Sequence, residues 1–137
     1  MIKKNSSNCI AVPMATVKSV TKSSVWYQKV LGCKSDHGGD EYDQIVSDGR
    51  MVLQLHAWDI DHHHDDLLGK KNVKSRGNGL VLWFYVDDID GALKRIKKAK
   101  AKVLKPVGVN PNANHREIWL RDLDGYTVVL SGRYGDL

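Results

Sequence analysis

The chain has 137 residues and a mass of 15.4 kDa, the size of one ordinary domain or of two small modules that share a core. Hydrophobic residues make up 42% of it, and no run approaches the roughly 18 apolar residues that a membrane span needs. The formal charge of +5 comes largely from the segment 94–105, which has the pattern of a solvated face of an amphipathic helix. Because no basic and aromatic motif accompanies this charge, we expect no nucleic-acid partner.

The first eight residues form a short polar lead-in without the apolar segment of a signal peptide. We therefore expect a cytoplasmic protein with no membrane partner. Cys9 and Cys33 fall in or beside predicted strands and lack CxxC spacing, which favours buried free thiols over a disulfide or a zinc site.

The first half of the chain predicts a β-α-β-β-β order. Its segments are a strand at 9–17, a helix at 24–31, and strands at 33–37, 42–46 and 51–58. Pro13 restricts the first strand to an edge or a bulge. Thr21 or Ser23 is the expected N-cap of the helix, and Gly32 is its expected end. The Asp48-Gly49 pair predicts a hairpin between the last two strands.

The segment 59–79 has no periodicity and is rich in His, Asp, Lys, Asn and Gly, so we expect a surface loop or linker. Beyond it the same order returns. Its segments are a strand at 80–86, a helix from the Asp87-Asp88-Ile89-Asp90 cap to about Lys100, a strand at 102–107, and a hairpin over 115–130.

The closing hairpin is the clearest element of the chain. Two alternating runs, at 118–121 and 127–130, flank a turn centred on Asp124-Gly125. Its period of two predicts that Trp119 and Val129 face the same space.

The two repeats predict an α+β fold with two βαβββ modules, at about 9–58 and 80–131, within a single domain that spans 1–137. Neither module can close its own sheet. We expect the two to form one curved mixed sheet around a cleft.

Several segments resemble the vicinal oxygen chelate superfamily, which includes glyoxalases, extradiol dioxygenases, fosfomycin-resistance enzymes and bleomycin-resistance proteins. They are Val17-Lys18-Ser19 through Ser23 with Trp26-Tyr27 before Leu31-Gly32, Phe84-Tyr85-Val86-Asp87-Asp88-Ile89, Arg116 to Arg121, and Asp122-Leu123-Asp124-Gly125. The last stands where the superfamily usually has Asp-Pro-Asp-Gly. The resemblance covers nearly the whole chain and implies the same fold.

In the superfamily's enzymes, His, Gln or Glu side chains on cleft-facing strands hold a divalent metal. The resemblance places these positions at or near Val12, Gln54, Val81 and Val129. A valine has no lone pair, and one amide oxygen cannot replace the three or more protein ligands of a catalytic metal. We therefore expect no metal cofactor there. The valines are equally compatible with ordinary core packing.

Without a metal, the resemblance implies a cleft similar to the ligand groove of bleomycin-resistance proteins. The residues expected to line it are Met14, Gln54, His56, Trp58, Trp83, Tyr85 and Trp119. Aromatic rings bury large areas and stack on planar or cationic ligands. The leading hypothesis is a non-catalytic or weakly catalytic binder of an aromatic small molecule, such as an antibiotic-sequestering resistance protein. Because a basic chain disfavours a cationic drug, an anionic or neutral ligand is an equal alternative.

The alternative hypothesis is a divalent-metal-dependent lyase or dioxygenase with an atypical site. His56 shares a strand face with Gln54, and Glu117 shares one with Trp119. A loop follows that carries Asp59, Asp61, His62, His63, His64, Asp65 and Asp66. Adjacent residues cannot all converge on one ion without a sharply folded backbone, which weakens this hypothesis.

The sheet edges predict assembly. Each module leaves an open strand edge and one apolar face, which a closed two-fold interface would cover on both chains. The resemblance also implies two-fold dimers with ligand grooves shared between chains. We expect a homodimer with two equivalent clefts, and the segment 59–79 is long enough to permit exchange of modules.

Overall fold

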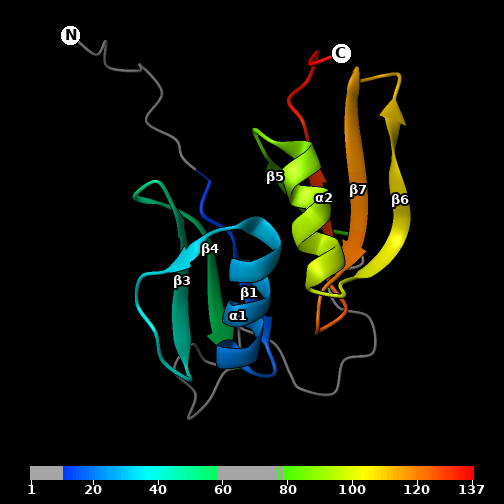
Figure 1. Cartoon of the computed structure of the whole chain (residues 1–137). Helices are drawn as coiled ribbons and strands as arrows, with labels where there is room; N and C mark the ends of the chain where they lie inside the picture. Colours follow the sequence, from blue (N-terminus) through cyan, green and yellow to red (C-terminus); the bar gives the residue numbers. More distant parts are fainter. Residues whose placement is uncertain (1–10, 59–76, 78) are drawn as a thin grey trace, which may run out of the picture.

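The computed structural model describes residues 11–58, 77 and 79–137. Its elements form two βαβββ modules (Figure 1). The first contains β1 (Met14–Val17), α1 (Val20–Leu31), β2 (Lys34–Ser35), β3 (Tyr42–Ser47) and β4 (Arg50–Ala57). The second contains β5 (Val81–Tyr85), α2 (Ile89–Lys98), β6 (Lys102–Asn110), β7 (His115–Arg121) and β8 (Thr127–Ser131). The predicted α+β class and the repeated order are confirmed.

Each module forms a four-stranded mixed sheet, in the orders β1-β4-β3-β2 and β5-β8-β7-β6. The first strand of each module runs parallel to its last strand, and the other neighbours are antiparallel. Over the described ranges, the backbone ladders join strands of one module only. The two halves of the predicted curved sheet therefore meet through helices and side chains.

The predicted starts of the first strand and of the helix in the first module differ from the structure. β1 begins at Met14, after Pro13, which cannot donate to a ladder. The helix begins at Val20, earlier than predicted, because Ser19 is its N-cap and accepts a hydrogen bond from the Lys22 N–H at 3.2 Å. The predictions of Thr21 or Ser23 as the cap were therefore wrong. Gly32 ends the helix in the left-handed conformation, as predicted.

Both Asp-Gly hairpins form. Asp48 and Gly49 both have positive φ, 50° and 76°, as a type I′ turn requires. Gly125 has φ of 93°, and β7 pairs with β8 in an antiparallel register. In the second module, Asp88 caps α2 by accepting from the Gly91 N–H at 3.0 Å, and β6 extends beyond its predicted end to Asn110.

Each helix covers one face of its own sheet, and α1 lies beside α2 (Figure 1). The faces beneath the helices hold the core, in which Leu53, Leu55, Leu120, Val128 and Leu130 are fully buried. Each such side chain contributes about 1.5–3 kcal/mol through burial. We call the opposite face of each sheet its open face. None of the helices in the described ranges is long and apolar enough to cross a membrane.

The turn between β7 and β8 ties the second module to the first. The Tyr27 hydroxyl of α1 donates to Asp122 Oδ2 at 2.6 Å, and both residues are buried. The Lys18 N–H donates to Asp124 Oδ1 at 2.7 Å. The Tyr126 hydroxyl donates to the Thr16 carbonyl at 2.9 Å. The Asp-Leu-Asp-Gly segment therefore holds the modules together as well as closing a hairpin.

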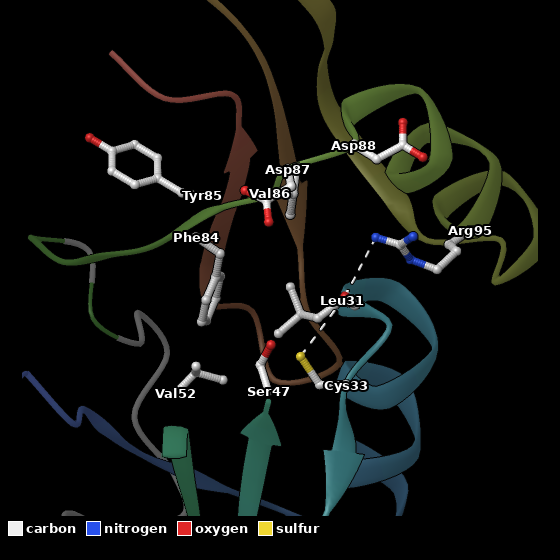
Figure 2. Close-up of a pocket in the computed structure, with 10 residues that line it drawn as sticks. All are labelled: Leu31, Cys33, Ser47, Val52, Phe84, Tyr85, Val86, Asp87, Asp88 and Arg95. Carbon is white, nitrogen blue, oxygen red and sulfur yellow. Dashed lines mark hydrogen bonds between the residues drawn. The ribbon is translucent and has the colours of Figure 1, made fainter. Parts of the chain in front are cut away.

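A second tie joins the two helices. The Arg95 guanidinium of α2 donates to the last carbonyls of α1, with Nε 3.2 Å from Val30 O and Nη2 3.5 Å from Leu31 O. These carbonyls have no partner within the helix, so a cation there satisfies them and opposes the negative end of the helix dipole. Figure 2 shows this side chain pointing at Leu31 across the module boundary.

Candidate functional site

The open face of the second sheet carries a row of indole rings. Trp83 on β5, Val129 on β8 and Trp119 on β7 pair in register, so their side chains lie on one face. The two indoles meet edge to face, with ring centroids 5.9 Å apart and an interplanar angle of 83°. Val129 between them is fully buried. The prediction that Trp119 and Val129 face the same space is confirmed.

Trp83 is held in place yet remains accessible. Its indole N–H donates to the Ser131 hydroxyl at 2.8 Å, and its ring lies 5.9 Å from that of His115. Even so, 40% of Trp83 and 53% of neighbouring Tyr85 are exposed. A ring that is fixed before a ligand arrives costs little ordering entropy on binding.

These two residues border a groove of about 510 Å³ between the modules. Leu80 and β5 line one side, and the first module supplies Ala11, Pro13 and Arg50–Val52. The lining is mostly apolar, and the volume falls within the range of small-molecule sites. We call this cavity the β5 groove.

The open face of the first sheet carries a separate polar cluster. The Tyr42 hydroxyl donates to Gln54 Oε1 at 2.7 Å, and Gln54 Nε2 donates to the Val12 carbonyl at 3.2 Å. The Tyr42 ring packs edge-on against His56, with centroids 6.2 Å apart. Met14 pairs in register with Gln54 and is 39% exposed.

The residues predicted to line one cleft thus fall into separate groups. Trp83, Tyr85 and Trp119 lie on the open face of the second sheet, whereas Met14, Gln54 and His56 lie on that of the first. Trp58 follows the end of β4 at Ala57, so the strand alternation used to orient it does not extend that far.

The superfamily's metal positions offer a poor donor set. Val81 and Val129 have no donor atom, and both polar atoms of Gln54 are engaged by Tyr42 and Val12. Among the described residues, no three His, Cys, Asp or Glu side chains gather closely enough to hold an ion. The residues present therefore do not fit the usual metal. The histidines at 62–64 lie outside the described residues.

Sequence reasoning missed a buried ionic network beside the indole row. His115 Nε2 lies 2.8 Å from Glu117 Oε1, which also accepts from Asn110 Nδ2 at 2.9 Å. Glu117 Oε2 accepts from the Trp119 indole N–H at 2.5 Å. His115 and Glu117 are only 4% and 6% exposed. The signal was available in the strand alternation, which places both on the face of Trp119.

Glu117 remains ionised within this network. Burial raises the pKa of its carboxyl, but the hydrogen bonds from Trp119, Asn110 and His115 outweigh burial and hold the pKa below its usual value. An ionised Glu117 requires the proton of the short contact to lie on His115 Nε2. The other ring nitrogen, Nδ1, is buried without a hydrogen-bond partner among the described residues.

A smaller pocket of about 200 Å³ lies at the module boundary (Figure 2). Leu31, Cys33, Ser47 and Val52 line one side, and Phe84–Asp88 with Arg95 line the other. Cys33 is a free, half-buried thiol, whereas full burial was predicted. Burial raises its pKa, which keeps the thiol protonated and a poor nucleophile. Cys9 lies outside the described residues.

Paired βαβββ modules with open sheet faces define a glyoxalase-like fold. The family model of the Glyoxalase/Bleomycin resistance protein/Dioxygenase superfamily matches residues 10–130. The chain belongs to this superfamily, as the resemblance indicated. No curated protein matches the chain significantly.

Solved structures share the fold at low sequence identity. A glyoxalase/bleomycin resistance protein/dioxygenase from Nocardioides has a TM-score of 0.71 and 14% identity, covering 98% of this chain and 89% of its own. A lactoylglutathione lyase from Agrobacterium tumefaciens has a TM-score of 0.67 and 17% identity, covering 93% and 96%. TioX from Micromonospora sp. ML1 has a TM-score of 0.65 and 16% identity, covering 89% and 96%. At these identities the comparison shows the fold alone.

Proposed function

We propose that this protein binds an aromatic small molecule in the β5 groove, without the usual metal of its superfamily. One observation carries the proposal: Trp83 is fixed by Ser131 and Trp119, yet it stays 40% exposed beside an apolar groove. A core tryptophan would be covered, and a surface tryptophan would not be anchored on two sides. Antibiotic sequestration in the cytoplasm is the physiological role we propose.

The donor set supports binding over metal chemistry. Valines replace donors at three of the four positions, and Gln54 is already hydrogen-bonded at both ends of its amide. A metal-dependent lyase or dioxygenase would have to draw ligands from His56 and the histidines at 62–64.

We also propose a homodimer in which a second copy completes the wall of the β5 groove. β1 and β5 are edge strands, and Met14, Val81, Trp83 and Tyr85 leave 37–53% of their surfaces exposed on or near those edges. A two-fold partner would border the groove on each chain, so the dimer would have two equivalent grooves.

The function is tested by a thermal-shift screen of antibiotics, thiol conjugates and divalent metals. A ligand that binds only the folded state raises the melting temperature by mass action. We expect an aromatic compound to stabilise the wild type and to stabilise Trp83→Ala much less. Tyr134→Ala, which removes a ring that is 74% exposed elsewhere, is the matched control and should respond as wild type.

Stoichiometric metal, with an activity that His56→Ala abolishes, would instead establish the enzyme. Stabilisation that is equal in wild type and Trp83→Ala would place the ligand outside the β5 groove.

A further inference from the structure

A second pocket lies at the outer edge of the second sheet, where β6 departs from regular pairing with β7. Lys105 pairs with Trp119, and Gly108 pairs with Glu117. Between these two pairs β6 advances by three residues while β7 advances by two, which makes a bulge in β6. Pro106 lies in this bulge and has no N–H to give to the ladder. The bulge opens a pocket of about 340 Å³ bordered by Glu117 and Trp119. It shares no lining residue with the β5 groove.

Gly108 leaves the space in front of Glu117 open. In the described part of the chain, a Cβ at Gly108 would have only the Pro106 carbonyl oxygen within 4 Å, at 3.9 Å. The remaining walls come from Lys105, Pro106, Val109, Asn110, Pro111 and Asn112. The pocket is therefore a gap that the bulge and a glycine create in front of a buried carboxylate.

Glu117 gives this pocket a fixed negative charge. Its side chain is held on three sides by His115, Asn110 and Trp119 and cannot turn to solvent. Oε1 already accepts two hydrogen bonds, whereas Oε2 accepts one, from Trp119, and has a lone pair left. A further N–H donor that enters the pocket can therefore bind Oε2.

Trp119 gives the pocket a fixed aromatic wall, because the bond from its indole N–H to Glu117 sets the orientation of the ring. A carboxylate beside an indole is the combination that attracts an organic cation with an apolar part, through a charge-assisted hydrogen bond and packing against the ring. We propose that this pocket binds an organic cation, whose ammonium donates to Glu117 Oε2 while its apolar part lies against Trp119.

Among the described residues that line the pocket or contact the carboxylate, Lys105 and His115 are the other charged or titratable groups. His115 is already paired with Glu117 Oε1 and does not occupy the remaining lone pair of Oε2. Lys105 lies on an exposed strand, so its flexible side chain can turn to solvent when a cation enters. The fixed carboxylate therefore decides the sign of the ligand, although the chain as a whole is basic.

The test is a titration of the full chain with three matched probes: benzylammonium, benzyl alcohol and phenylacetate. The Trp119 indole N–H signal, assigned with Trp119→Phe, reports binding in ¹H–¹⁵N spectra. We expect benzylammonium to shift this signal saturably and to bind at least about tenfold more tightly than the neutral alcohol. Phenylacetate should not saturate. Equal affinity for the cation and the alcohol, or a preference for the anion, would overturn the proposal.

Three variants sharpen the test. Glu117→Gln should weaken benzylammonium binding at least about tenfold, while Lys105→Ala should tighten it because a competing positive charge is removed. Gly108→Val should block the pocket without backbone strain, since Gly108 is not among the residues with positive φ. Should Glu117→Gln fail to fold, the two other variants decide the matter. Benzylammonium binding that neither Lys105→Ala nor Gly108→Val changes would contradict the proposal.

Discussion

Tyr27 and Asp122 form a buried polar contact between the modules. Removing the Tyr27 hydroxyl leaves the Asp122 carboxyl without its donor from α1, and an unsatisfied buried polar group costs about 1–3 kcal/mol. We expect Tyr27→Phe to lower the free energy of unfolding by that amount in urea denaturation. Tyr134→Phe, at an exposed ring, is the control and should change it little. Equal stability of Tyr27→Phe and wild type would show that this hydrogen bond does not hold the modules together.

Asp43 makes stability depend on pH. Burial raises the pKa of its carboxyl, but hydrogen bonds from Ser24, Gly38, Ser35 and Gln44 outweigh burial and lower the pKa. A pKa that is lower in the folded state stabilises the protein above the unfolded value of about 4, and this stability is lost as pH falls through the folded pKa. The lowered pKa of Glu117 makes stability depend on pH in the same direction. Burial instead raises the pKa of Asp122, so the contribution of Asp122 to stability falls as pH rises.

The expected result is that Asp43→Asn destabilises the protein at pH 7 and that the difference from wild type shrinks towards pH 3. Urea midpoints measured across this range provide the check, with Asp40→Asn at an exposed position as the control. A difference that stays constant with pH would mean that the Asp43 charge is not what the network stabilises.

β6 is an edge strand whose residues are nearly all exposed, including Val103, Leu104, Val107 and Val109. Such an edge invites pairing with another chain, and Pro106, Lys105 and the bulge oppose it. We expect Lys105→Val combined with Pro106→Val to form larger assemblies in size-exclusion chromatography. Lys97→Ala, which removes a charge from α2, should not. Unchanged elution of the double variant would show that Lys105 and Pro106 are not what prevents β6 from pairing with another chain.

The elements also show what the sequence could predict. Two Asp-Gly turns and the alternating runs around them fixed β3, β4, β7 and β8, because turn chemistry and alternation are local properties. The N-cap of the first helix was misplaced because several hydroxyl side chains lie close together there. They are Ser19, Thr21, Ser23 and Ser24, and the structure shows that Ser19 is the cap. The pocket bordered by Glu117 and Trp119 could not be predicted, because it depends on a bulge in β6. It also depends on Asn110, whose side chain reaches Glu117 only after β6 and β7 pair.

Within the described ranges, the modules meet through the β7–β8 turn and the α1–α2 pair, and β1 and β5 each stand at one edge of their sheet. The homodimer is tested by light scattering at micromolar concentration. We expect a mass near twice 15.4 kDa. A mass near 15.4 kDa would refute the dimer, and one bound ligand per dimer would refute two equivalent grooves.

An aromatic small molecule in the β5 groove would contact Trp83 and the rest of β5. The most direct measurement is a ¹H–¹⁵N titration with a compound that stabilises the protein in the thermal-shift screen. We expect the largest shifts at the Trp83 indole N–H, which is bonded to Ser131, and at the amides of Leu80–Tyr85. Shifts confined to the polar cluster around Gln54 and His56 would contradict binding in the β5 groove.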